Sequence, residues 1–138
     1  MQKPDEALLT KVIKDWTEWC YAQSASKGFW EDTDRLAGLI AISSVHPAKE
    51  RYLKTLGLLE DTQKFGLMHA ELSEALEAAR KNLMSDHIEG FTGIEEELAD
   101  AIIRIFDYAG RRQIDLGRAI VAKMNFNATR PFKHGKEF

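Results

Sequence analysis

Two pairs of acidic residues, each three positions apart, are the part of this sequence with the clearest potential for chemistry. Glu71 and Glu74 lie in one predicted helix, and Glu97 and Asp100 lie in the next. Side chains at positions i and i+3 lie side by side on a helix, about 5–6 Å apart at Cβ. If the two helices pack against each other, the pairs would form a cage of four carboxylates.

Four carboxylates held together repel one another, so such a cage needs a bound cation or unusual protonation. Hard oxygen ligands without a thiol or an imidazole favour Mg²⁺, or Mn²⁺, over Zn²⁺. A di-iron site would need Glu-x-x-His motifs, whereas the i+3 partners here are Glu74 and Asp100. The alternative is a solvated surface, because a single Glu-x-x-Glu is common on exposed helix faces.

The spacing of apolar residues predicts an all-α chain, a bundle of four or five helices. Asp5 and Asp115 are predicted N-caps, and Gly57 leaves open whether two of the predicted segments form one helix. A short loop at 85–93 should make the two acidic helices antiparallel neighbours. The predicted helical segments run from residue 5 to between 24 and 28, and over 33–44, 48–59, about 61–82, about 94–111 and 116 to about 128.

Apolar stripes on these helices predict which sides face the core. One acidic helix presents a stripe that includes His69, for which we expect packing rather than metal binding, and Cys20 is also expected to pack. The predicted core positions are Phe65, Met68, His69, Leu72, Leu76 and Ala79 in the first acidic helix, and Leu98, Ile102, Ile105, Phe106 and Ala109 in the second.

Composition narrows the class of protein. The chain has 138 residues and a net charge of −3, which favours one domain (1–138) and disfavours binding to a nucleic acid polymer. No apolar run approaches the roughly 20 residues that cross a membrane, and the N-terminus lacks a signal-peptide core. With a single cysteine, we expect a cytoplasmic protein without a membrane partner.

The C-terminal region is basic. Lys123, Asn127 and Arg130 recur at i, i+4 and i+7, and Lys133, His134 and Lys136 follow. Cations beside a carboxylate-bound metal suit a phosphate ligand. The alternative is favourable charge at the end of a helix.

Five blocks of sequence together resemble the MazG-like branch of the all-α NTP pyrophosphohydrolases, most fully over residues 61–136. The blocks are 27–30 (Lys-Gly-Phe-Trp), 69–77 (His-Ala-Glu-Leu-Ser-Glu-Ala-Leu-Glu), 96–100 (Glu-Glu-Leu-Ala-Asp), 103–107 (Ile-Arg-Ile-Phe-Asp) and 123–136. The resemblance implies a hydrolase that converts a nucleoside or deoxynucleoside triphosphate to the monophosphate and pyrophosphate. It also implies a homodimer or a dimer of dimers, in which helices from two subunits complete each site.

The resemblance assigns roles to particular residues. Mg²⁺, with Mn²⁺ as an alternative, would be held by Glu71, Glu74, Glu97 and Asp100, and the nucleophile would be a water molecule rather than a side chain. The substrate contacts it implies are Lys123, Asn127, Arg130 and Lys136 for phosphate and nucleotide, and Lys27 and Trp30 for base or sugar.

Two departures from the family pattern and two other functions stay open. The segment between Trp30 and Leu58 is longer than in compact members, and Ala70 stands where many members carry a further glutamate. Phe29 and Trp30 could simply pack rather than form a platform at a site. The alternative functions are a non-catalytic helical interaction module and a nucleotide-binding regulator with slow turnover.

Overall fold

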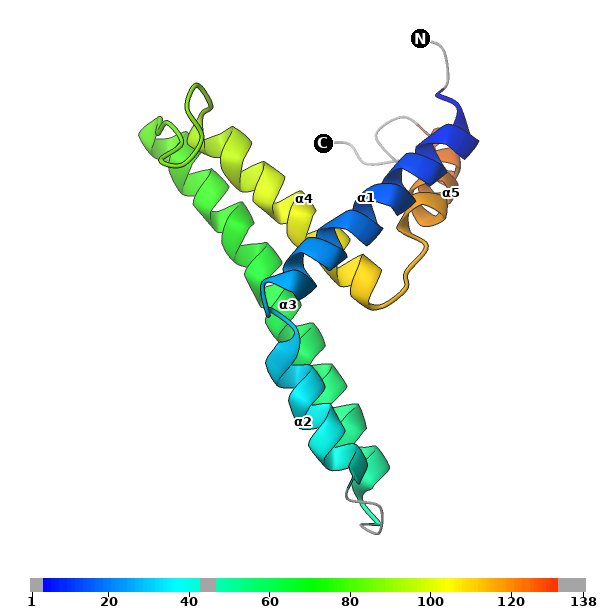
Figure 1. The fold of residues 1–138 in the computed structure, drawn as a ribbon. Coiled ribbons are helices and arrows are strands. Elements are labelled where there is room, and N and C mark those ends of the chain that lie inside the picture. Colours follow the sequence, from blue (N-terminus) through cyan, green and yellow to red (C-terminus); the bar gives the residue numbers. More distant parts are fainter. Residues whose placement is uncertain (1–3, 43–46, 132–138) are drawn as a thin grey trace.

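The computed structural model of the protein describes residues 4–42 and 47–131. These residues form five α-helices and no strand (Figure 1). The helices are α1 (Glu6–Ser26), α2 (Glu31–Ile42), α3 (Lys49–Lys81), α4 (Gly93–Arg111) and α5 (Leu116–Ala128). The expectation of an all-α chain of four or five helices is therefore confirmed.

The helix α3 is continuous over 33 residues and passes through Gly57. A glycine inside a helix costs up to about 1 kcal/mol relative to alanine. The guanidinium of Arg112 compensates here, because its Nη2 donates to the Gly57 carbonyl at 3.2 Å and to Asp61 Oδ1 at 2.6 Å. The same nitrogen lies 2.6 Å from Glu60 Oε2. One side chain at the end of α4 therefore contacts the glycine and two acidic residues that follow it in α3.

Side-chain caps set the start of three helices. Asp5 accepts from the backbone nitrogens of Ala7 and Leu8 at the start of α1, and Asp115 accepts from Arg118 at the start of α5. Both predicted caps are confirmed. Thr92 and Glu95 form a reciprocal capping box at the start of α4, which satisfies backbone donors that a helix end leaves unpaired.

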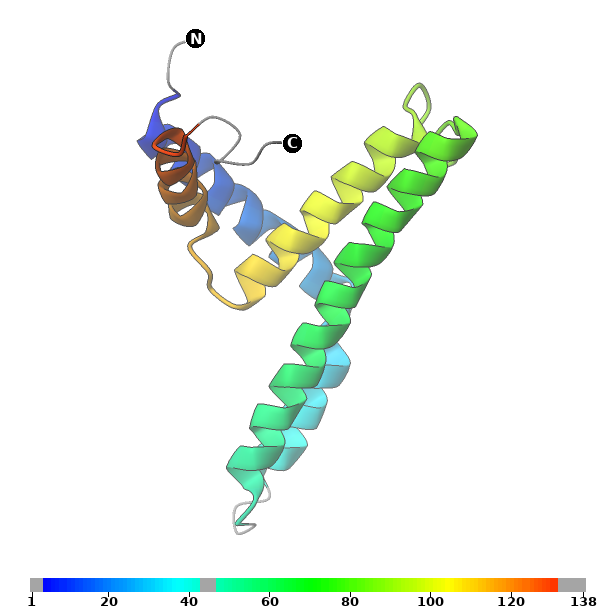
Figure 2. The same ribbon diagram turned by 180° about the vertical axis from the view of Figure 1, so that it is seen from behind.

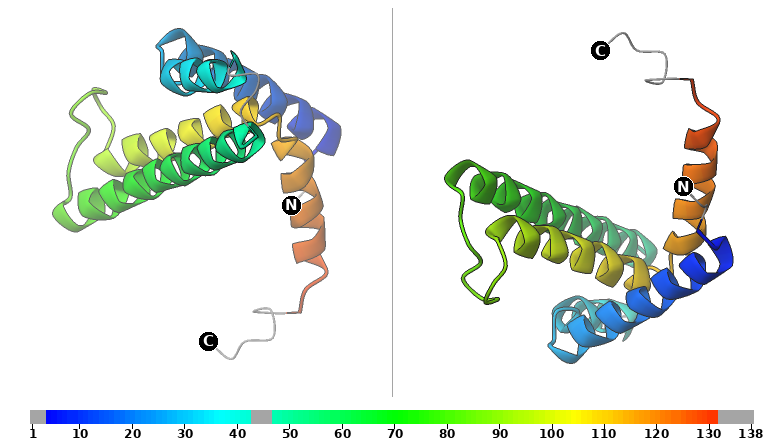
Figure 3. Two further views of the ribbon diagram at one scale, coloured as in Figure 1. Left: turned by 90° about the horizontal axis from the view of Figure 1, so that it is seen from below. Right: turned by 90° about the horizontal axis from the view of Figure 1, so that it is seen from above.

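The helices pack in pairs. α3 and α4 form an antiparallel hairpin, α1 crosses α4, and α5 lies along α1. α2 lies along the N-terminal part of α3, and these two segments project beyond α1 and α4 (Figures 1 and 2). Figure 3 shows α3 and α4 side by side, with α5 far from the loop that joins them.

Small side chains dominate the buried positions. Among residues 4–42 and 47–131, four of the seven buried apolar residues are alanines, and Trp30 is the largest side chain that is fully buried. Cys20, only 3% exposed, packs as expected, and burial raises the pKa of its thiol. The buried apolar residues are Ile13, Cys20, Trp30, Ala75, Ala78, Ala101 and Ala109.

The prediction that the apolar stripes of α3 and α4 face a core is wrong for most of their residues, although Ala109 is buried as predicted. Leu72 is 50% exposed, Leu76 61%, Leu98 45% and Ile102 51%. α3 and α4 bury the neighbouring stripe of small residues instead, such as Ala75. None of the described helices combines the length and the apolar character that a membrane-spanning segment requires.

We expect Gly110→Ala to destabilise the protein by about 1–3 kcal/mol, the usual cost of overpacking. A Cβ at Gly110 would lie 2.6 Å from the Thr17 carbonyl oxygen, where α4 crosses α1. Gly57→Ala is the matched control, because a Cβ there meets no atom within 4 Å, and it should stabilise α3. Thermal or urea unfolding measures both, and a loss no greater for Gly110→Ala would contradict the close crossing.

Candidate metal centre and adjoining pocket

The antiparallel packing of α3 and α4 brings three of the four predicted acidic ligands together. Glu71 comes from α3, and Glu97 and Asp100 come from adjacent turns of α4. One carboxylate oxygen of each residue lies within 4.8 Å of the corresponding oxygens of the other two, a spacing that could hold a metal ion. Glu71 is only 5% exposed. We call Glu71, Glu97 and Asp100 the acidic trio.

Glu74, the fourth predicted ligand, is exposed and lies outside the trio. It is nevertheless close enough for its charge to act on Glu97, where it contributes to a raised pKa. Its role as a ligand stays a prediction.

The electrostatics of the trio favour a cation. Burial is the main cause of the raised pKa of Glu97, and the charges of Glu74 and Glu71 add to it. Burial also raises the pKa of Asp100, with Glu71 adding to the effect and Arg104 opposing it. Partial desolvation and like charge both disfavour the ionised carboxylates, and a bound cation would relieve both.

Arg104 is a residue of this site to which the sequence analysis gave no role. Its Nε donates to Glu71 Oε1 in a short ion pair. Its position four residues after Asp100, on the same side of α4, is the signal that could have identified it. The guanidinium supplies positive charge to the trio and leaves Glu71 oriented toward α4.

Trp30 is buried, which agrees with the interpretation that it packs rather than forms a platform at a site. The side chain is 2% exposed, and its Nε1 donates to Asp107 Oδ1 at 2.8 Å. Lys64 Nζ lies 3.6 Å from the centre of the indole ring and 3.6 Å from Asp107 Oδ2. The substrate contact predicted for Trp30 would therefore need a rearrangement, whereas Lys27 and Phe29 are exposed.

A cavity of about 690 Å³ adjoins the trio. This volume is within the range of small-molecule pockets. Asp100 of the trio and Arg104, which pairs with Glu71, contribute to its wall. Two aromatic rings, two side-chain amides and two cations also line it. These belong to Trp19, Phe29, Gln23, Gln63, Lys27 and Lys64. The sequence analysis identified Lys27 and Phe29 but neither glutamine.

The predicted phosphate contacts do not reach the trio within one chain. Lys123 and Asn127 lie on α5, which packs against α1 and lies away from the acidic end of the hairpin (Figure 1). α5 ends at Ala128, so Arg130 lies beyond the helix. The helix ends where the sequence predicts, and it does not extend far enough to place Arg130 on one helical face with Lys123 and Asn127. Lys136 lies outside the described residues.

His87 and Glu89 lie on the surface, in the loop before α4. Both are exposed, and His87 Nδ1 lies 2.7 Å from Glu96 Oε1. This pairing raises the pKa of His87 and fastens the loop to α4.

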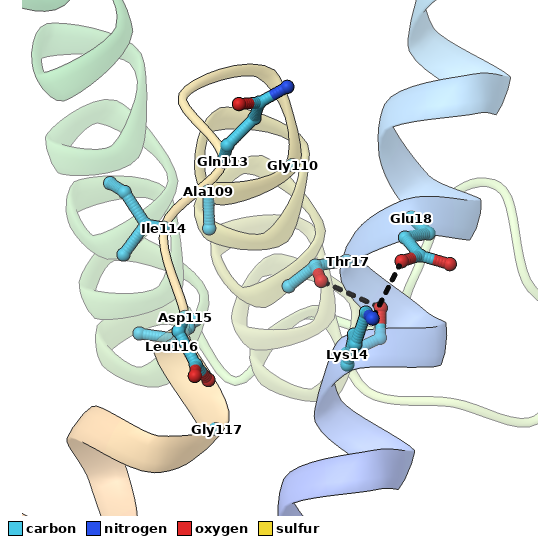
Figure 4. Close-up of a pocket in the computed structure, with 10 residues that line it drawn as sticks. All are labelled: Lys14, Thr17, Glu18, Ala109, Gly110, Gln113, Ile114, Asp115, Leu116 and Gly117. Atoms are coloured by element: carbon cyan, nitrogen blue, oxygen red, sulfur yellow. Dashed lines mark hydrogen bonds and ion pairs between the residues drawn. The ribbon is translucent and has the colours of Figure 1, made fainter.

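A second hollow lies where α1 faces the junction of α4 and α5 (Figure 4). Its volume is about 430 Å³. On one side lie Lys14 and Glu18 of α1, whose Nζ and Oε1 atoms are 3.7 Å apart. On the other side lie Gln113 and Asp115. None of the predicted site residues lines this hollow, so the chemistry indicated by the sequence belongs to the cavity beside the trio.

Comparison with known proteins gives no relative whose site could be compared with this one. No family model matches the chain, and searches of curated proteins and of solved structures also give no match.

The raised pKa values of Glu97 and Asp100 predict that these two carboxyls destabilise the metal-free protein increasingly as pH rises. Above about pH 4 they have released protons in the unfolded chain that they still hold in the folded protein, so their contribution to the free energy of unfolding falls from there through the raised pKa values. Urea unfolding in EDTA measures this slope. Glu97→Gln should flatten it and raise stability at pH 7, and an excess of Mg²⁺ should stabilise only the unsubstituted protein. An unchanged slope in Glu97→Gln would contradict the electrostatic account.

Proposed function

We propose that this protein is a Mg²⁺-dependent hydrolase that converts nucleoside or deoxynucleoside triphosphates to monophosphates and pyrophosphate. The observation that carries the proposal is the acidic trio, whose oxygens lie within 4.8 Å of one another beside a cavity of about 690 Å³. Attack at the α-phosphorus follows from the resemblance to the MazG-like pyrophosphohydrolases.

The donor set fits a hard divalent cation. Glu71, Glu97 and Asp100 would hold it through oxygen atoms alone, as Mg²⁺ and Mn²⁺ prefer. When bound, such an ion polarises a phosphoryl oxygen and lowers the pKa of a water molecule. Arg104 orients Glu71 through its ion pair, and it offers a cation to phosphate oxygens at the wall of the cavity.

The cavity supplies recognition of the remainder of the nucleotide. Trp19 and Phe29 are 54% and 70% exposed, which leaves ring faces available for stacking against a base. Gln23 and Gln63 offer amide donors and acceptors to the polar edge of a base. Lys27 is the predicted substrate contact that lines this cavity, and Lys64 adds a second cation.

A homodimer or a dimer of dimers is part of the proposal. Leu72 and Leu76 of α3 and Leu98 and Ile102 of α4 form a largely exposed apolar surface. A second copy that covers this surface would bury it from water and complete the helical bundle. Another subunit could then also contribute Lys123, Asn127 and Arg130, which one chain does not bring to its own trio.

The products of hydrolysis test the proposal directly. We expect (d)NMP and pyrophosphate from at least one nucleoside triphosphate in the presence of Mg²⁺, resolved by ion-exchange chromatography. Asp100→Asn should lower turnover by about a hundredfold or more, because losing a ligand costs at least as much as losing a residue that supports one. Glu77→Gln is the matched control, because Glu77 pairs with Lys81 outside the trio. Release of orthophosphate, or full activity in Asp100→Asn, would refute the proposal.

The extensive exposed apolar surface also favours the second candidate, a helical interaction or nucleotide-binding regulatory module. Thermal melting with Mg²⁺ and a non-hydrolysable nucleoside triphosphate separates the candidates. A nucleotide site predicts stabilisation of about 2.7 kcal/mol at a ligand concentration one hundred times Kd. The ligand should leave the melting temperature of Asp100→Asn nearly unchanged. Stabilisation without any product would favour the regulator, and no stabilisation would favour the interaction module.

A further inference from the structure

The loop that joins α3 to α4, residues 82–92, is fastened to the start of α4 by one histidine (Figure 1). His87 Nδ1 lies 2.7 Å from Glu96 Oε1, and the backbone nitrogens of His87 and Ile88 donate to Ser85 Oγ at 3.2 and 2.8 Å. The Glu96 side chain is 12% exposed and the His87 side chain 82%. The carboxylate is therefore mostly enclosed, whereas most of the imidazole is open to a ligand.

Glu96 continues the line of α4 residues that forms one wall of the cavity beside the acidic trio. Asp100, Ile103 and Asp107 follow Glu96 at i+4, i+7 and i+11, which places all four on one side of the helix. The last three line the cavity. At 1.5 Å per residue, Glu96 lies about 6 Å beyond Asp100 along the helix axis. The line therefore runs from the cavity, through one residue of the trio, to the carboxylate that holds His87.

The charges at this end of the hairpin act on one another. The hydrogen bond to Glu96, together with the charge of that carboxylate, raises the pKa of His87, so the imidazole stays cationic at higher pH than an isolated histidine. Burial is the main cause of the raised pKa of Asp100, and the charges of Arg104 and His87 oppose it. The imidazole is therefore close enough to the trio for its charge to act there.

The second ring nitrogen of His87 is free to donate. Because the Glu96 carboxylate accepts from Nδ1, Nε2 points away from that carboxylate, and it has no hydrogen-bond partner among residues 4–42 and 47–131. An imidazolium donates from both nitrogens. The other charged residues of the loop, Asp86 and Glu89, are acidic and would repel an anion. Any attraction of this loop for phosphate therefore depends on the one histidine.

The proposed function gives a triphosphate a direction along this line of α4. With the base in the cavity and the α-phosphorus at the trio, the two further phosphoryl groups extend away from the cavity, toward Glu96 and His87. Phosphate oxygens form their strongest hydrogen bonds with cationic donors. Lys123 of α5 does not reach this place within one chain, whereas His87 belongs to the loop that adjoins it.

We propose that His87 binds the terminal phosphoryl group of the substrate through Nε2, and that Glu96 is the positioning residue that holds its ring. The contact rests on the proposed function for the direction of the substrate. It provides selectivity for triphosphates, because a diphosphate with its α-phosphorus at the trio is one phosphoryl group shorter. The pyrophosphate product, which contains the terminal phosphoryl group, keeps the contact until it leaves.

Isothermal titration calorimetry of the full chain with Mg²⁺ and inorganic pyrophosphate measures this contact without turnover. His87→Asn should weaken pyrophosphate binding about tenfold, the lower end of what a hydrogen bond to a charged group contributes. The asparagine amide can still donate to Glu96 as Nδ1 does, so the loop should stay fastened. His87→Arg, which can donate to Glu96 and to phosphate together, should restore binding.

Arg80→Gln is the matched control for net charge. It removes a cation at the same end of the hairpin, from an exposed position about half a turn from Glu71 around α3, and it should leave pyrophosphate binding unchanged. An equal loss in Arg80→Gln would show that net charge alone matters. Unchanged binding in His87→Asn would leave the histidine a role in the loop alone. Either result, or a lack of pyrophosphate binding by the unsubstituted protein, would overturn the proposal.

Nucleotide analogues test the selectivity and separate this contact from the proposed function. The affinities for the α,β-methylene analogues of a nucleoside triphosphate and of its diphosphate should differ about tenfold less in His87→Asn than in the unsubstituted protein, since one charge-assisted hydrogen bond is lost from the triphosphate alone. An equal loss for both analogues would indicate a structural role and overturn the proposal. Because these are binding measurements, a failure to form products would refute the proposed function alone, and hydrolysis with unchanged selectivity in His87→Asn would refute this contact alone.

Discussion

Close packing between α3 and α4 is the contact on which the candidate site depends. Ala75 and Ala78 of α3 and Ala101 of α4 are buried, and small side chains let helix axes approach closely. A Cβ on Gly93 would lie 2.9 Å from the Cβ of Ala78, which shows how little space remains. This packing holds the acidic trio together although burial and like charge raise the pKa values of Glu97 and Asp100. Apolar packing between α3 and α4 thus holds together three carboxylates although their burial and mutual repulsion oppose this arrangement. A bound cation would offset the repulsion.

A cluster of three side chains, Trp30, Lys64 and Asp107, connects the site to the segment that follows α1. Trp30, which follows α1, donates to Asp107 of α4, and Lys64 of α3 lies against both. Burying charge in this way is favourable only when hydrogen bonds and an opposite charge accompany it, and this cluster has both. It fixes the loop that carries Lys27 and Phe29, so the aromatic wall of the cavity takes its position from α4, the helix that also carries Glu97 and Asp100.

Many large apolar side chains of the described residues are not covered within the chain. Few large apolar side chains are buried, whereas leucines and isoleucines remain exposed on two different sides of α3. One side, with Leu72 and Leu76, lies beside α4 near the trio, and the other, with Leu58 and Leu59, lies on the N-terminal half of α3.

The helical class, the caps Asp5 and Asp115, and the meeting of the two acidic segments could be predicted from the sequence, because capping, periodicity and a short connecting loop act over a few residues. Which stripes are buried could not be predicted in this way. A periodic stripe predicts an apolar face but not whether the fold buries it, and here Leu72 and Leu98 stay 50% and 45% exposed. The Trp30–Asp107 hydrogen bond joins residues 77 positions apart. Likewise, Arg112, at the end of α4, donates to Gly57 and Asp61 in the middle of the continuous helix α3. Such contacts depend on where helices cross, and local spacing carries no information about crossings.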